Sequence, residues 1–113
     1  MIRSILIALM LACPARADDL VDYQVDEGAI AQPLTEQPGD PARGKKIVLD
    51  PERGNCLICH PMPIAEVEFQ GDVGPDLAGV GSRYGAGEIR LRVVDAKRLN
   101  PDSAMPAYYR TEG

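Results

Sequence analysis

The stretch that decides the fold of this chain is Cys56-Leu57-Ile58-Cys59-His60. The order Cys-x-x-Cys-His is the attachment signature of a c-type haem. Two cysteines three positions apart lie on one side of a helical turn, where each thiol can form a thioether bond with one vinyl group at the haem edge. His60 follows directly and can turn its ring toward the iron, for which a proximal His is a common axial ligand. The motif therefore predicts one covalent haem c, bound by Cys56, Cys59 and His60.

Three other interpretations of this motif have less support. A zinc site needs two further ligands, and the chain without its leader contains no other Cys and no other His. A thioredoxin-like redox pair would lie in a βαβ pattern, which the sequence lacks. A structural disulfide across two intervening residues is strained. Haem attachment is therefore the favoured interpretation.

The first seventeen residues predict a secretory signal peptide. Arg3 gives a positive start, residues 5–11 form an apolar run, and Ala15-Arg16-Ala17 is a small-x-small cleavage site. The apolar run is too short to span a bilayer. We expect cleavage after Ala17, a periplasmic location and no membrane span in the mature chain. A lipoprotein-type cleavage at Cys13 is the alternative.

Cleavage leaves residues 18–113, which is at most one small domain. The formal net charge of −5 becomes −7 once Arg3 and Arg16 leave with the leader. Such an acidic chain is not expected to bind nucleic acid, which requires a basic face. Residues 18–42 carry seven acids and no base, whereas residues 83–98 carry five bases against two acids. Ordinary solvated surface explains most of these charges, and a docking surface for a protein partner is the alternative.

The remaining chain divides into an arm and a helical domain. Residues 18–39 show no sustained hydrophobic period and predict an extended acidic arm, which could wrap a partner. The domain spans residues 40–113. Its first helix begins at Asp40-Pro41, which supply the N-cap and the first helical position, and ends at Asp50-Pro51. Prolines keep residues 61–72 in a loop, and a second helix is expected over residues 87–99.

A second axial ligand is identified by elimination. His60 is the only His, and the two leader methionines are removed with the signal. Met62 is two residues from His60 and cannot reach the opposite haem face. Met105 remains, and Pro106 keeps its segment out of a helix, as a loop that lays a thioether over the haem requires. Met105 is therefore the predicted distal ligand, with a Met that fills a core gap as the alternative.

A short helix followed by the haem motif resembles the opening of the class I cytochromes c. In that family a Gly-Pro-x-Leu stretch places a Pro carbonyl against the proximal His, and this chain has Gly74-Pro75-Asp76-Leu77. The resemblance implies that the Pro75 carbonyl accepts the Nδ1–H of His60 and so fixes the tautomer of the ring. An ordinary Pro-Gly turn is the alternative.

The chain as a whole resembles the SoxX family, the small monohaem c subunits of the SoxAX complexes of bacterial thiosulfate oxidation. The stretches that carry the resemblance cover most of residues 39–110: Gly39-Asp40-Pro41-Ala42-Arg43-Gly44, Gly54-Asn55-Cys56-Leu57-Ile58-Cys59-His60, Gly74-Pro75-Asp76-Leu77, Arg90-Leu91-Arg92-Val93-Val94-Asp95-Ala96-Lys97 and Asn100-Pro101-Asp102-Ser103-Ala104-Met105-Pro106-Ala107-Tyr108-Tyr109-Arg110. The resemblance implies an all-α, class I cytochrome c-like fold of small helices around one haem. Such folds end in a C-terminal helix that packs on the first helix, whereas this sequence stops at Gly113 directly after the Met105 loop. We therefore expect a fragment of a longer chain that lacks this helix, with a first helix that buries its face on a partner as the alternative.

The resemblance also implies a function. SoxAX complexes join thiosulfate oxidatively to a cysteine of a carrier protein, with bond formation on the larger SoxA subunit. The implied role of this chain is a non-catalytic one, in which it accepts electrons from a SoxA-like subunit and passes them to an external cytochrome c. The carrier protein and the acceptor cytochrome would be transient partners. The alternatives are a free-standing soluble class I cytochrome c and a haem module of another oxidoreductase.

Overall fold

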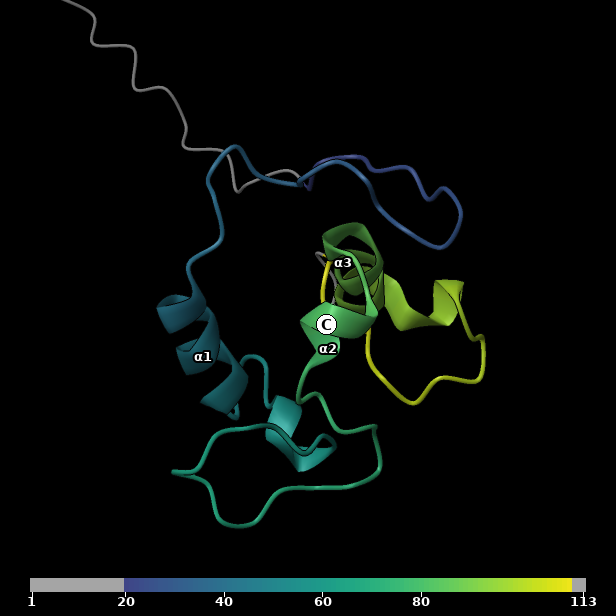
Figure 1. Cartoon of the computed structure of the whole chain (residues 1–113). Helices are drawn as coiled ribbons and strands as arrows, with labels where there is room; N and C mark the ends of the chain where they lie inside the picture. Colours follow the sequence, from purple (N-terminus) through teal and green to yellow (C-terminus); the bar gives the residue numbers. More distant parts are fainter. Residues whose placement is uncertain (1–19, 111–113) are drawn as a thin grey trace, which may run out of the picture.

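The computed structural model describes residues 20–110, so the predicted leader and the first two residues of the arm lie outside the described part (Figure 1). The elements, in chain order, are α1 (Pro41–Leu49), the 3₁₀ turn η1 (Cys56–Ile58), α2 (Val80–Arg83), α3 (Ala86–Asp95) and the 3₁₀ turn η2 (Ala96–Arg98). Residues 20–110 form no β-strand beyond an isolated bridge between Asp26 and Ala29. The prediction of a small helical domain is confirmed.

Helix α1 begins and ends where the sequence predicts. The Asp40 carboxylate accepts hydrogen bonds from the amides of Ala42 (2.9 Å) and Arg43 (3.2 Å), and Pro41 occupies the first helical position. These contacts satisfy amides that the first helical turn leaves without a partner. No side chain of α1 is fully buried, and the helix contacts η1 at its carboxyl end. Helix α1 therefore leads directly into the Cys-x-x-Cys-His motif.

Helix α3 forms the centre of the domain. The Glu88 carboxylate accepts a hydrogen bond from the Gly85 amide at 2.8 Å, which caps the helix start. Leu91 and Val94 are buried. The 3₁₀ turn η2 follows directly after the last residue of α3. The helix predicted over residues 87–99 is confirmed, although its last turn is 3₁₀. The four-residue helix α2 was not predicted; it follows Gly79, whose φ is +67°.

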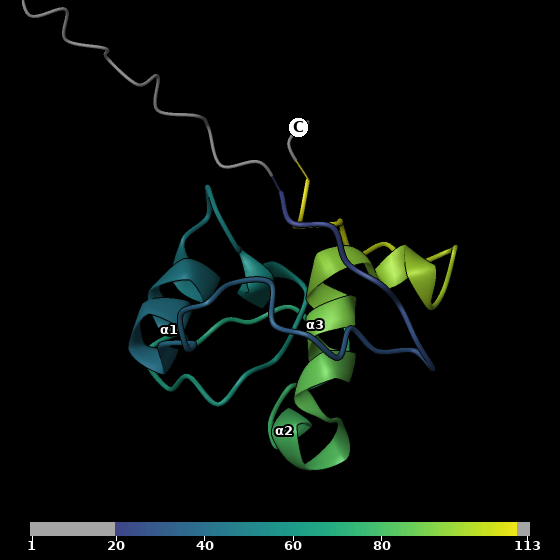
Figure 2. The same ribbon diagram turned by 90° about the horizontal axis from the view of Figure 1, so that it is seen from above.

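The arm lies across α3 (Figure 2). The Ile30 amide donates to the Gly87 carbonyl at 3.0 Å, and the Arg90 guanidinium donates to the Ile30 carbonyl. The Ile30 side chain is 1% exposed and forms the core with Leu91 and Val94. Around this core pack Tyr23, Val25, Leu34 and Tyr109. The middle of the arm therefore packs on α3, whereas Leu20 and Val21 near its start are exposed.

No helix between residues 20 and 110 has the length and apolar character that crossing a membrane requires.

Truncation of Ile30 tests whether the arm belongs to the folded core. Ile30→Ala removes buried methyl and methylene groups between the arm and α3, so the free energy of unfolding should fall by about 2–5 kcal/mol in urea titrations. The control is Val21→Ala, because the Val21 side chain is 53% exposed. If Ile30→Ala costs no more than this control, the arm does not contribute to the core.

Candidate haem site

The two cysteines lie on one tight turn. The amides of Cys59 and His60 both donate to the Cys56 carbonyl, at 3.2 and 3.0 Å. Asn55 precedes the turn in the left-handed region (φ 48°), which Asn tolerates better than most residues, and this reverses the chain into the motif. Both thiols are free and half-buried. Burial raises the pKa of the Cys56 thiol. A backbone hydrogen bond lowers this pKa in part, and the neighbouring Cys59 raises it further, so the thiol stays protonated at neutral pH.

The imidazole of His60 is held in one tautomer. Its Nδ1 lies 2.8 Å from the Pro75 carbonyl oxygen. Because a carbonyl can only accept, Nδ1 carries the proton and Nε2 keeps its lone pair. Gly74 also lies close to the ring, because a Cβ atom at this position would overlap three ring atoms. The ring is therefore held by a hydrogen bond and a close backbone contact, and its free lone pair is available to a metal.

Backbone hydrogen bonds bring the following loop back to the motif. The Gly71 amide donates to the Leu57 carbonyl at 2.8 Å, and the Gly74 amide donates to the Cys59 carbonyl at 2.7 Å. A Cβ atom on Gly71 would overlap the Ile58 carbonyl, so this close approach requires glycine. Gly71 was not among the site residues predicted from the sequence. The signal available in the sequence was the pair of glycines three residues apart, just before Pro75.

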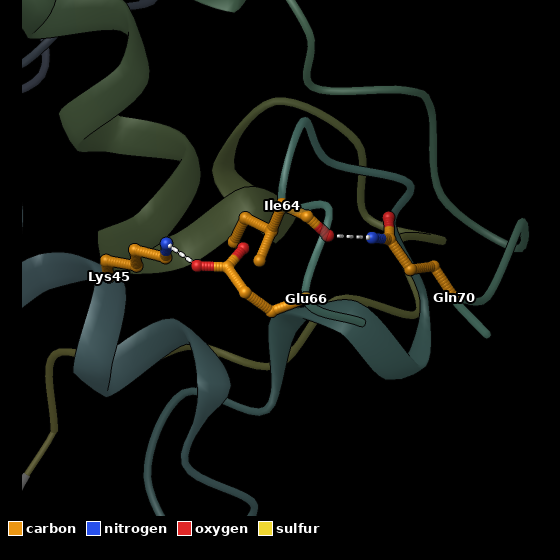
Figure 3. A network of polar contacts seen from close by, with 4 residues as sticks. All are labelled: Lys45, Ile64, Glu66 and Gln70. Atoms are coloured by element: carbon orange, nitrogen blue, oxygen red, sulfur yellow. Dashed lines mark hydrogen bonds and ion pairs between the residues drawn. The ribbon is translucent and has the colours of Figure 1, made fainter. Parts of the chain in front are cut away.

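A polar network holds the same loop against α1 (Figure 3). The side-chain oxygen of Gln70 accepts a hydrogen bond from the Met62 backbone amide at 2.6 Å. The side-chain nitrogen of Gln70 donates to the Ile64 and Val67 carbonyls, both at 3.1 Å. An ion pair between Lys45 of α1 and Glu66 joins the loop to the helix. These residues were also missed, because a Gln and a Glu inside a polar loop carry no local signal of their partners.

Met105 lies on a separate segment that follows η2. It is half-buried, and its amide donates to the Ser103 hydroxyl at 3.3 Å. The segment reaches the haem motif through Tyr108, whose hydroxyl donates to the Gly54 carbonyl at 2.8 Å. Burial raises the pKa of the Tyr108 phenol, and the two nearby thiols, Cys56 and Cys59, act in the same direction. Among the predicted residues, His60 and Pro75 are joined directly, the cysteines share a turn, and the connection of Met105 to them is indirect.

These residues fit a covalent haem. Two free thiols lie on one turn, and the next residue presents an imidazole whose Nε2 lone pair is free because Nδ1 is bound to a carbonyl. Within residues 20–110 no group of three or more His, Cys, Asp and Glu side chains is placed to hold a metal ion without a cofactor.

The comparisons with known proteins agree with this fit. No family model and no curated protein matches the chain. A solved structure does: the crystal structure of SoxXA from P. pantotrophus is 36% identical, with a TM-score of 0.75, over 80% of this chain and 67% of that chain. A small helical domain built around a Cys-x-x-Cys-His turn defines the class of small c-type cytochromes. At this identity and coverage the chain belongs to the SoxX family within that class.

The support of the His60 ring by Gly74 can be tested by adding one methyl group. Gly74→Ala should displace the ring or the loop and lower the free energy of unfolding by about 1–3 kcal/mol, the usual cost of overpacking. Gly44→Ala is the control: Gly44 lies inside α1, the added carbon would meet no atom within 4 Å beyond the local backbone of the helix, and the variant should raise stability by about 0.5–1 kcal/mol. Equal unfolding midpoints for Gly74→Ala and wild type would contradict the close contact.

The ion pair of the loop predicts a pH dependence. The hydrogen bond from Lys45 lowers the pKa of Glu66 below its ordinary value of 4.5. A carboxyl with a lowered pKa stabilises the fold above its unfolded pKa, and this contribution is lost as the pH falls through the folded pKa. Glu66→Gln should therefore lower the urea midpoint at pH 7, and the gap to wild type should narrow as the pH falls below the unfolded pKa of Glu66 and shrink in about 1 M salt. Glu68→Gln is the control, because Glu68 takes no part in the Lys45–Glu66 pair, which is the one ion pair within residues 20–110. This variant should show no such gap.

Proposed function

We propose that this chain is the electron-transfer haem c subunit of a periplasmic thiosulfate-oxidising complex, an L-cysteine S-thiosulfotransferase of the SoxAX type. The observation that carries the proposal is the 36% identity to SoxXA from P. pantotrophus over 80% of the chain. The proposed stable partner is a SoxA-like large cytochrome subunit, and a sulfur-carrier protein and an acceptor cytochrome would bind transiently. Export through the N-terminal leader is part of the proposal.

Each proposed site residue has one task. Cys56 and Cys59 would form the thioethers, and His60 would bind the iron through Nε2, with the Pro75 carbonyl 2.8 Å from Nδ1 to hold the ring plane. Met105 would bind the opposite face through its thioether. When bound, the haem supplies an iron centre that takes up and releases one electron at a time. A His/Met ligand pair favours a relatively high reduction potential, which suits an electron acceptor.

The proposal leaves no thiol and no imidazole of this chain for the sulfur chemistry. Beyond the leader, its only thiols are Cys56 and Cys59 and its only imidazole is His60, and the proposal assigns all three to the cofactor. The resemblance implies a reaction in which a carrier thiol and thiosulfate form a sulfur–sulfur bond and release one proton and two electrons. The carrier thiol and the bond-forming site would therefore lie on partner proteins. This chain would take the two electrons one at a time.

Stopped-flow reduction of the haem-loaded chain tests the proposal. The protein is produced in a host that attaches c-type haem, and denaturing mass spectrometry should show one haem retained through Cys56 and Cys59. Thiosulfate and the carrier protein are then mixed with this chain, with and without the SoxA-like subunit. We expect rapid haem reduction only when the large subunit is present, because that subunit makes the sulfur–sulfur bond.

Three results would count against the proposal. Loss of the haem under denaturing conditions would contradict covalent attachment. Equal reduction rates with and without the large subunit would refute the division of labour between subunits. Failure to form a stable complex with any SoxA-like protein would favour a free-standing class I cytochrome c carrier.

A further inference from the structure

Two neighbouring tyrosines anchor the segment that carries Met105. The amides of Tyr108 and Tyr109 donate to the Val93 and Val94 carbonyls of α3, at 3.3 and 3.4 Å. Their side chains then diverge. The Tyr109 hydroxyl binds the backbone of Val21 in the arm: it accepts a hydrogen bond from the Val21 amide at 2.8 Å and donates one to the Val21 carbonyl. The Tyr108 hydroxyl instead donates to Gly54.

Gly54 is a rigid anchor point at the entry to the haem turn. It is buried, and its amide donates to the Ile47 carbonyl of α1 at 3.1 Å. An added Cβ atom would approach that carbonyl to 2.5 Å, so the backbone at Gly54 lies directly on α1. The next residues are Asn55 and Cys56. The Tyr108 hydroxyl therefore binds a fixed carbonyl two residues before the first haem-binding cysteine.

The Met105 loop is fixed at both ends. On its N-terminal side, the Ser103 amide donates to the Asn100 carbonyl at 3.0 Å, and the Met105 amide donates to the Ser103 hydroxyl. On its C-terminal side, Tyr108 follows Met105 by three residues, with Pro106 between them limiting backbone freedom. A ligand tethered in this way binds with an effective concentration set by the tether. Because a thioether is a soft and uncharged ligand, its retention on iron depends strongly on that constraint.

We propose that Tyr108 is a positioning residue whose hydroxyl, bound to the Gly54 carbonyl, clasps the Met105 loop to the haem-attachment turn and keeps the Met105 thioether on the iron. The inference rests on the proposed function, in which Met105 is the distal ligand. The hydroxyl is the essential group, because the ring of Tyr108 is 40% exposed and makes a smaller packing contribution. Removal of the hydroxyl also leaves the buried Gly54 carbonyl without this partner.

The matched pair Tyr108→Phe and Tyr109→Phe tests the clasp in the haem-loaded chain. The two variants each remove one hydroxyl, at neighbouring positions. Only Tyr108→Phe removes the hydrogen bond to the Gly54 carbonyl that joins the Met105 loop to the haem turn. Titration of the ferric protein with imidazole measures how readily the distal ligand is displaced. Loss of one hydrogen bond should make imidazole bind about five-fold more tightly to Tyr108→Phe. Its reduction potential should also fall, and its thioether-to-iron absorption band should weaken. Tyr109→Phe should match wild type in all three measurements.

Met105→Ala separates a failure of the clasp from a failure of the ligand assignment. If Met105→Ala keeps the wild-type spectrum and imidazole affinity, Met105 is not the ligand, and both the assignment and the clasp are overturned. If Met105→Ala opens the sixth position while Tyr108→Phe behaves as wild type, only the clasp is overturned. Equal changes in the two tyrosine variants would indicate general loosening and would also overturn it.

Hydrogen exchange of the wild-type protein provides a second measurement that needs no variant to fold. A clasp couples the Met105 loop to the haem turn, so the amides of Met105 and Tyr108 should exchange with the same opening rate as the amides of Cys59 and His60. Faster and independent exchange of the Met105 amide would overturn the proposal.

Discussion

The hydrogen bond between His60 Nδ1 and the Pro75 carbonyl is the interaction on which the rest of the site depends. It requires a loop of fifteen residues to return to its starting point, and that return costs conformational entropy. The loop is held by backbone bonds from Gly71 and Gly74, by the Gln70 amide and by an ion pair to α1. The orientation of one imidazole thus results from the contacts of Gly74 and Pro75 with the ring and from several weak contacts that hold the loop in place.

The core beside this site is small and is completed by distant parts of the chain. Helix α3 supplies Leu91 and Val94, whereas the third buried residue of the core, Ile30, comes from the arm. Helix α1 buries no side chain fully and is joined to the rest through η1, the loop and Gly54. The domain therefore consists of a packed part around α3 and a less buried part around α1. The Cys-x-x-Cys-His turn lies in the second part.

Local signals in the sequence predicted the local structure well. Asp40-Pro41 marked the start of α1 because capping depends on residues that are adjacent in sequence, and the cysteine spacing predicted a single turn that carries both thiols for the same reason. The short helix α2 was missed, since four residues carry no amphipathic period. Docking of the arm on Gly87 and the bonds of Glu66 and Tyr108 were missed because each joins residues that are distant in sequence. Composition and periodicity contain no information about such pairs.

The pairing of the arm with the end of the chain affects how this protein can fold. Arg90 contacts the arm across 60 residues, and Tyr109 contacts it across 88. Contacts of this range are slow to form, because the loop-closure entropy of the intervening chain opposes them. The core around Ile30 closes only when the arm meets α3, which begins more than fifty residues after Ile30. Cys56 and Cys59 lie inside that interval, between the two segments that the core joins.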